Sequence, residues 1–461
     1  MRRMMRRVRA AAMLLEVTVA TGVAVGVAGW AFAAATGLAI RWLWHDLPLR
    51  LGVGSVRDAD LAQWPFWFTF PIMAVGAVLL MVNERTNSVT VTPIMGVIDE
   101  VRRTGRYGRR ALVLPYFVAA WLPLAFGAAA GPEAGLANVV ASAATRFGGA
   151  MHAAAAECLR AMRIGDDPRL DGEKRKPDGA RTADEDEDSA RSDATVSDAS
   201  AKTGKKNAPS AELSAAARRT VDAAAVACGV AVFFGLGRLT GYGLALPRLS
   251  PIRWHAQDAL WAVPALIAGI AAGALFVGMT RLSRLVAERF GDHVLTRDLA
   301  VALVVSAASC TLPFMLFSGE SDLDLLVAHA AQAGPVLLAL IAVARCVTAP
   351  LCIGMGWRGG QFFPMIFVGV TLGYALGGAT GADPVFCAAC SSGALIAMVI
   401  RRPLIASLIM MLVMPLPSFP LLLAAAYAAS LVPLPRTFDG VPALRPHLPD
   451  RMLRRMPHRT H

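Results

Sequence analysis

Residues 344–373 read ARCVTAPLCIGMGWRGGQFFPMIFVGVTLG, two apolar segments separated by a glycine-rich break. The break is GMGWRGG at residues 354–360, and the second apolar segment opens with QFFP at residues 361–364. A helix that starts inside apolar surroundings directs unpaired backbone N–H groups, and the positive end of its dipole, at whatever lies in front of it. At membrane depth, irregular backbone is tolerated only where it is buried in protein or lines a wet cavity. The stretch therefore predicts an anion site inside a membrane protein.

The composition of the chain indicates the same class. Of its 461 residues, 56% are hydrophobic and 17% are charged, whereas soluble domains carry about 25% charged residues. About ten apolar segments approach the length of a membrane-spanning helix, and several are short or interrupted by glycine and proline. We therefore expect an all-α integral membrane protein. The candidate spans are residues 10–40, 65–82, 111–130, 223–246, 258–280, 298–317, 332–355, 362–378, 384–400 and 403–432.

Positive charge gathers beside the apolar segments. The net charge is +12, and arginines are concentrated in residues 1–9, 102–110 and 451–455. Because cytoplasmic loops are enriched in Lys and Arg, we expect a multi-pass plasma (inner) membrane protein with both termini in the cytoplasm and an even number of crossings. Nothing typical of base stacking or DNA binding accompanies these patches, so no nucleic-acid partner is expected. The first apolar run is longer than a signal-peptide core, so we expect an uncleaved helix.

One charged stretch divides the chain. Residues 163–219 include DEDED at 184–188 and KRK at 174–176, with few large apolar side chains. Such a segment cannot bury enough surface to order itself, which predicts a disordered loop, either a solvated spacer or a partner-binding segment. The predicted parts are a first membrane half, 1–162, the loop, 163–219, a second membrane half, 220–435, and a short basic cytoplasmic tail, 436–461. Because this tail is short, we expect no cytosolic regulatory domain after the second membrane half.

A second break, GPEAG at residues 131–135, lies in the first half. Its Pro132 suits the first position of a new helix, and Glu133 is a carboxylate between apolar segments, where an acid is functional by default. The alternative is a short turn outside the membrane with a solvated glutamate. Interrupted helices in corresponding halves point to a transport site between inverted repeats. Glu133 would then compete with a permeating anion for the same N–H groups and act as a gate.

Other chemistries find less support. The seven cysteines lie mostly in apolar segments and are expected to be small buried hydrophobes, and Cys387 and Cys390 lack the second ligand pair of a zinc site. No metal or cofactor is expected. An enzyme using Glu133 as a base would need a nucleophile, a metal or a second converging carboxylate, so we do not expect an enzyme. A scaffolding protein would leave both broken helices unexplained.

The two breaks resemble the CLC family of chloride channels and chloride–proton antiporters. Residues 359–364, GGQFFP, are similar to the family's G-G-x-F-x-P at the start of a half-helix. Arg345 and the turn at residues 354–356 precede it as in the family, with Met355 in place of a serine. Residues 131–135 are similar to a degenerate G-[KR]-E-G-P motif. The resemblance implies a divergent bacterial-type member.

The resemblance implies a CLC-type inverted repeat with interrupted and half-spanning helices, in a homodimer with one anion path per subunit, embedded in lipid. Glu133 would be the gating glutamate. A family serine that binds the central anion would correspond to Ser88, Thr90 or Thr92, and the pore tyrosine only by position to Tyr427 or Phe438. The implied anion-binding residues are Gly131, Gly359, Gly360, Gln361, Phe362 and Phe363, with Ser88, Thr90 and Thr92.

Proton coupling is the open part of this interpretation. Family transporters relay protons through a second, inward-facing glutamate, and no residue here matches it. Glu157 is too near Glu133 in the sequence, and residues 223–246 contain no acid, with only Asp222 at their edge. This favours a channel or an uncoupled transporter over a strict proton antiporter. Chloride is the expected anion, fluoride is the alternative, and a cation path is disfavoured by the helix-end geometry.

Overall fold

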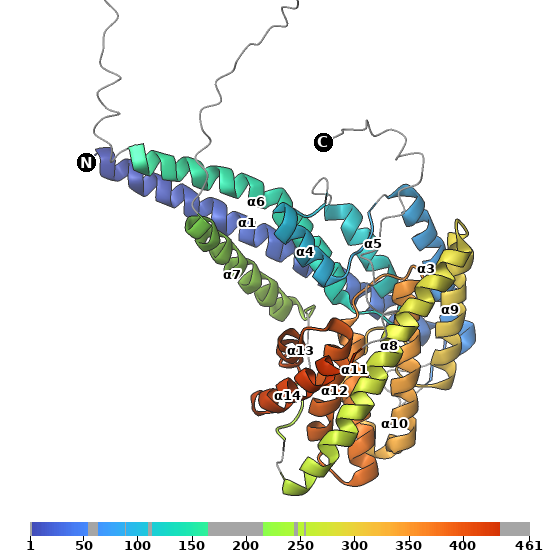
Figure 1. Cartoon of the computed structure of the whole chain (residues 1–461). Helices are drawn as coiled ribbons and strands as arrows, with labels where there is room; N and C mark the ends of the chain where they lie inside the picture. The colour runs from blue at the N-terminus through green and yellow to red at the C-terminus, as the bar shows by residue number, and fades with distance from the viewer. Residues whose placement is uncertain are drawn as a thin grey trace, which may run out of the picture. The chain divides into compact units, whose positions relative to one another are not determined.

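The computed structural model describes residues 2–53, 63–87, 89–108, 113–164, 215–243, 248–252 and 255–433, and within these ranges the chain is helical without a β-strand (Figure 1). Seven of the described helices are long and apolar enough to cross a membrane, and three apolar helices are shorter. The prediction of an all-α membrane protein is confirmed. Residues 165–214 and 434–461, which hold most of the predicted charged loop and the whole predicted tail, lie outside the described residues.

The structure describes the following helices in chain order. They are α1 (Arg2–Arg41), a π-helical turn (Trp42–Asp46), α2 (Leu47–Arg50), α3 (Phe66–Thr86), α4 (Ile94–Thr104), α5 (Val113–Ala125), α6 (Pro132–Ile164), α7 (Ala215–Thr240), a 3₁₀ turn (Ala256–Trp261), α8 (Ala262–Phe290), α9 (Val294–Thr311), α10 (Leu323–Gly354), α11 (Phe362–Thr380), α12 (Pro384–Ile400), α13 (Pro403–Met410), a 3₁₀ turn (Leu416–Ser418) and α14 (Phe419–Leu431).

Some helix ends differ from the predicted spans. The run predicted over 298–317 stops being helical at Thr311, because Pro313 disfavours helical geometry at the residue before it. The chain then forms an irregular loop up to α10, with positive φ at Phe314 and Phe317. The last predicted span, 403–432, is two shorter helices, α13 and α14.

The described chain forms two compact units. The described residues of Met1–Val23 and Phe147–Gly229 form the smaller unit, and those of Ala24–Arg146 and Val230–His461 form the larger one. In the smaller unit, His152 Nε2 lies 2.6 Å from Asp222 Oδ1. Both predicted breaks belong to the larger unit.

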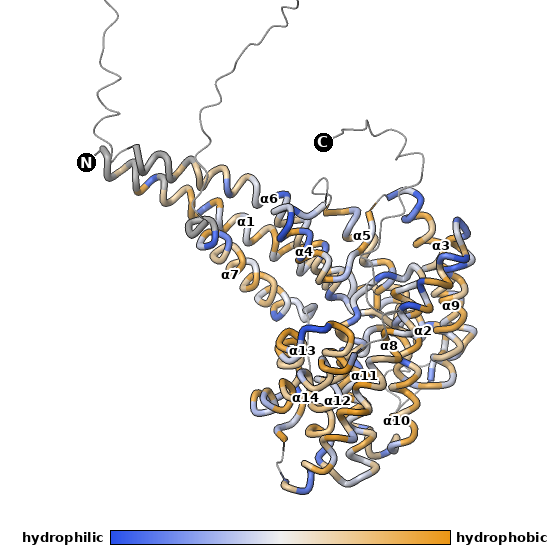
Figure 2. Tube along the Cα trace, in the orientation of Figure 1, coloured by the Kyte–Doolittle hydropathy of each residue, from blue (hydrophilic) through white to orange (hydrophobic). Residues whose placement is uncertain are grey.

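Two helices, α11 and α12, form the core of the larger unit. They pack along each other, with α10 and α8 against them (Figure 1). Nearly every residue of α12 is buried, and α11 is buried over most of its length. Both are apolar on all sides (Figure 2), as expected for helices enclosed by others. A Cβ at Gly373 would collide with the backbone of Ala388, so small residues permit this close packing. The start of α11 is thereby held inside protein.

Candidate functional site

The two breaks meet. Gly131 and Gly360 exchange two backbone hydrogen bonds, with N···O distances of 2.8 Å and 2.7 Å. Gly131 directly precedes α6, and Gly360 stands two residues before α11. The structure therefore brings together the starts of two helices whose first residues are 230 apart in the sequence, Pro132 and Phe362.

Glu133 lies between these two helix starts. Its Oε1 accepts a hydrogen bond from the backbone N–H of Phe362 at 2.6 Å. A Cβ at Gly131 or at Gly360 would overlap the Glu133 carboxylate, so only glycine leaves room for it on either side. The Glu133 side chain is half-buried, and its Oε2 is buried with no hydrogen-bond partner among the described residues.

The carboxylate of Glu133 caps a helix to which it does not belong. The first N–H groups of a helix have no partner within it, and α11 starts after Gln361, whose side chain makes no capping hydrogen bond. Glu133 supplies the missing acceptor from α6. A carboxylate is favoured there by the helix dipole. Any small anion of suitable size would meet the same N–H groups if the carboxylate moved away.

A charged network fixes the glycine-rich break before α11. Trp357 is fully buried, and its Nε1 donates to the Asp298 carbonyl at 3.1 Å. Arg297 pairs with Asp298 at 2.9 Å and with Glu84 at 2.8 Å. Gly356 has a φ of 106°, and a Cβ there would collide with Arg297 and Asp298. The break is therefore a defined structure.

A buried arginine holds the loop between α9 and α10. Arg345 on α10 is fully buried, and its Nη1 and Nη2 donate to the carbonyls of Phe317 and Leu316 at 2.5 Å and 3.0 Å. Its guanidinium also stacks on Phe367 of α11, 5.0 Å from the ring centre. Arg345 thus links the loop to α11.

A neutral network supports the start of α6. Asn138 is buried on α6; its Nδ2 donates to the carbonyls of Thr92 and Ala134 at 2.8 Å and 2.6 Å, and its Oδ1 accepts from the Thr92 N–H at 3.1 Å. The Tyr107 hydroxyl bonds to both Asn138 and Thr92. Burial raises the pKa of Tyr107, so this hydroxyl stays protonated and donates. The Thr92 hydroxyl is therefore engaged in structure.

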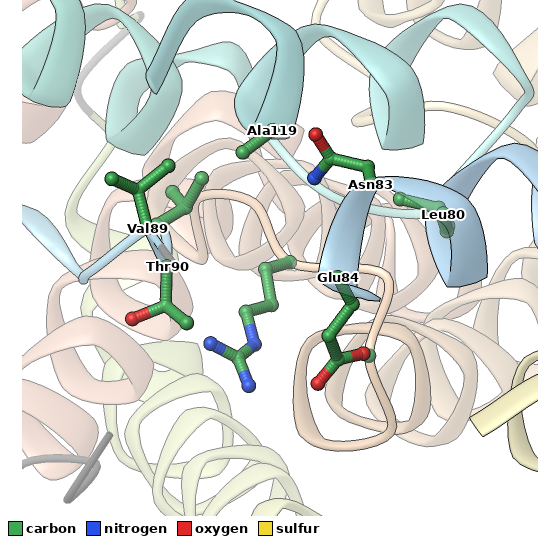
Figure 3. Close-up of a pocket in the computed structure, with 9 residues that line it drawn as sticks. Leu80, Asn83, Glu84, Val89, Thr90 and Ala119 are labelled. Atoms are coloured by element: carbon green, nitrogen blue, oxygen red, sulfur yellow. The ribbon is translucent and has the colours of Figure 1, made fainter. Parts of the chain in front are cut away.

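Thr90 has a different environment. It lines a cavity of about 30 Å³, together with Asn83, Glu84 and Arg358 (Figure 3). The volume suits a small ion or about one or two water molecules. Arg358 stands two residues before Gly360, so the two Cα atoms are at most about 7 Å apart.

The remaining predicted residues are distributed as follows. Gly359 packs on Ala130, where a Cβ would come within 2.6 Å of the alanine side chain. Phe362 and Phe363 are buried, whereas Tyr427 is exposed. Ser88 and Phe438 lie outside the described residues.

Sequence reasoning passed over Asn138, Arg358 and Glu320. A polar side chain in an alanine-rich helix is a signal that could have marked Asn138, five residues after Glu133. Arg358 was visible within the glycine-rich break, but nothing local indicated the cavity that it lines. Glu320 lies in a run that was predicted only to end a span.

Comparison with known proteins gives a consistent result. A family model described as voltage gated chloride channel matches residues 208–433. No curated protein matches the chain.

Three similar solved structures show the fold. A slow cyanobacterial Cl⁻/H⁺ antiporter has a TM-score of 0.60 and 18% identity, covering 94% of this chain and 96% of that one. A CLC-type fluoride/proton antiporter has a TM-score of 0.54 and 16% identity, covering 90% and 95%. A eukaryotic CLC transporter has a TM-score of 0.51 and 16% identity, covering 93% and 73%.

Proposed function

Because the chain belongs, through its second half, to the voltage gated chloride channel family, we propose that it carries small anions, chloride first, across the membrane that it spans. The observation that carries this proposal is the hydrogen bond from Phe362 N–H to Glu133 Oε1. A negative group already occupies the space in front of a buried helix start, and it belongs to a side chain that can rotate. The same space suits a permeating anion.

Glu133 acts as the gate in this proposal. As a carboxylate it caps α11 and excludes anions from the Phe362 amide. Protonation weakens it as an acceptor, and rotation then frees the N–H groups for an anion. Neutral amides and helix dipoles offset the anion's lost hydration without trapping it as a full positive charge would. The path continues to the cavity beside Thr90, which lines it, whereas Thr92, the other described hydroxyl candidate, does not.

The assembly and placement follow from the sequence and the resemblance. We propose a homodimer in the plasma membrane, with one path per subunit, both termini in the cytoplasm, and two membrane halves at 1–162 and 220–435. Exposed apolar side chains cover the outer helices, such as Leu340 and Val343 on α10, and they suit contact with lipid or a second copy. Crosslinking in native membranes would test the dimer.

Chloride efflux from liposomes tests the function. Purified protein should release chloride faster than empty vesicles do, and the rate should rise as pH falls, because protonation removes the competing carboxylate. Glu133→Gln should give a rate that does not depend on pH. Glu288→Gln, an equal change at an exposed glutamate on α8, should behave as the wild type. No efflux from wild type would overturn the proposal, and a Glu133→Gln rate that keeps the wild-type pH profile would remove Glu133 as gate.

Fluoride is the second candidate, because one similar structure is a fluoride/proton antiporter. The same liposomes loaded with fluoride and read by a fluoride electrode discriminate between the two. Faster fluoride than chloride release by the wild type would exchange the order of the two anions.

A further inference from the structure

The loop between α9 and α10, residues 312–322, brings a second acidic side chain towards Glu133. The loop packs on the segment that leads into α6: Phe317 N–H donates to the Gly127 carbonyl at 3.5 Å, and a Cβ at Gly127 would lie 3.5 Å from Leu316. Glu320 follows three residues after Phe317. Its carboxylate is within electrostatic reach of the Glu133 carboxylate.

Glu320 holds an unexplained buried atom. Its Oε2 is buried and has no hydrogen-bond partner among the described residues, although the side chain as a whole is only half-buried. The Oε2 of Glu133 has the same status. A buried carboxylate oxygen without a donor is costly, and a proton or a water molecule between the two groups would relieve both.

The loop that carries Glu320 is held in place. Gly319 has a φ of 83°, and a Cβ there would lie 2.6 Å from the Phe367 ring and 3.0 Å from Arg345 Nη2. The Arg345 guanidinium is committed to the carbonyls of Leu316 and Phe317. Arg345 therefore fixes the loop, and among the described residues no ion pair joins it to Glu320.

The charged groups near Glu320 that the described residues supply are mostly acids. Glu133 comes from α6, Asp322 from the same loop, and Arg345 from α10. Two of these three are acids, so the ionised form of Glu320 is opposed by burial and by its neighbours. A proton on either of two nearby carboxyl groups removes the repulsion between them.

We infer that Glu320 is the proton-carrying partner of Glu133, directly or through one water molecule. In the step, the O–H bond of protonated Glu133 breaks and a new O–H bond forms on the Glu320 carboxylate. Glu133 becomes a carboxylate and caps α11, Glu320 becomes a neutral acid, and the pair keeps one negative charge. The reverse transfer neutralises Glu133 and frees the Phe362 amide. The half-buried side chain of Glu320 then exchanges its proton with water.

This inference rests on the proposed anion transport and deepens it, because it supplies a proton route through a residue that is not the inward-facing glutamate sought in the sequence. It assigns the protein to proton-coupled exchange, whereas the sequence favoured a channel or an uncoupled transporter.

The test uses the full-length protein in liposomes with two readouts, anion efflux and the internal pH change driven by a chloride gradient. The wild type should move protons against their gradient. In Glu320→Gln, proton movement should fall by about tenfold or more, and the number of chloride ions moved per proton should rise. Glu320→Asp, which keeps the carboxylate, should retain part of the proton movement. Glu288→Gln should leave both unchanged.

Each outcome of this test either supports or overturns the inference. Anion efflux without proton movement in the wild type overturns the inference and leaves the proposed function intact. Proton movement that survives Glu320→Gln also overturns it. If wild type moves no anion, the proposed function fails, and infrared spectra of the detergent-purified protein at neutral pH judge the pair alone. A protonated-carboxyl band that Glu320→Gln or Glu133→Gln diminishes, and Glu288→Gln does not, supports the shared proton, and an identical band in all variants contradicts it.

Discussion

The two helix starts that meet at Gly131 and Gly360 are built differently. The start of α6 carries its own acid, Glu133, in its first turn, and a neutral network around Asn138 supports it. The start of α11 has no acid and no side-chain cap of its own, and the break before it is fixed by buried charges. The start of α6 carries the Glu133 carboxylate, and the start of α11 donates a hydrogen bond to it.

The proposed gate depends on this difference. If α11 were capped by its own side chain, its N–H groups would be satisfied permanently and unavailable to an anion. Because the capping carboxylate, Glu133, belongs to a different helix, α6, a rotation of its side chain is enough to remove it from α11. The rigid charged support behind α11 keeps the amides in position while the cap leaves, as pre-organised sites require.

The largest expected effect is on the buried support of the loop before α10. Arg345→Met removes both hydrogen bonds to carbonyls and leaves those carbonyls unpaired. Since a hydrogen bond to a charged group contributes about 1.5–3 kcal/mol, we expect the free energy of unfolding to fall by about 3–6 kcal/mol. Denaturation of the purified protein measures it, with the exposed Arg238→Met as control. Equal stability of the two variants would show that Arg345 does not stabilise the loop before α10.

Gly360→Ala disturbs the contact between the start of α6 and the start of α11. The added Cβ overlaps the Glu133 carboxylate, so we expect a loss of about 1–3 kcal/mol in stability, as overpacking usually gives, together with loss of anion efflux. Gly378 lies on α11 in open space, and Gly378→Ala should be neutral or stabilising by up to about 1 kcal/mol. If Gly360→Ala transports normally, the carboxylate does not occupy this space.

Substitutions at Thr92 and Thr90 should have different effects, the first on protein stability and the second on chloride binding. Thr92→Val removes a hydroxyl bonded to Tyr107, which should lower stability by about 1 kcal/mol without changing the apparent affinity for chloride. Thr90→Val should leave stability within about 0.5 kcal/mol and weaken chloride binding. Isothermal titration and thermal melting measure the two quantities. The opposite pattern would exchange the roles of the two hydroxyls.

The smallest expected effect concerns Gln361, the residue that directly precedes α11. Gln361→Ala should change stability by less than about 0.5 kcal/mol, because the Gln361 side chain makes no capping hydrogen bond. The same thermal melts measure it. A loss of 1 kcal/mol or more, as for a true N-cap residue, would mean that α11 does not depend on Glu133.

The sequence was informative where a local pattern has one physical meaning. Apolar length predicted the helical membrane class, and glycine and proline marked both helix breaks at Gly131 and Gly360. Their mutual hydrogen bonds could not be read from the sequence, because they join residues far apart. The predicted end of the span at residue 317 was wrong, since composition alone hides the effect of Pro313 on the helix end.

The site was only partly visible for the same reason. Glu133 was noticed because an acid is rare in apolar sequence. Glu320 was not, because it lies in SGESD at residues 318–322, a polar stretch typical of a loop. Whether Ser88, Thr90 or Thr92 faces an anion depends on tertiary contacts, such as the bonds from Asn138 and Tyr107 that engage Thr92.

The most direct test of the claim that the Glu133 carboxylate caps α11 in the place of an anion is a crystal structure of Glu133→Ala grown in bromide. Anomalous scattering would locate the bromide ion. We expect a bromide peak within hydrogen-bond distance of the Phe362 amide, between Gly131 and Gly360, that is absent from wild type in the same bromide. An empty site in Glu133→Ala, or a bromide ion beside an undisplaced carboxylate in wild type, would contradict the claim that Glu133 and a permeating anion share one position.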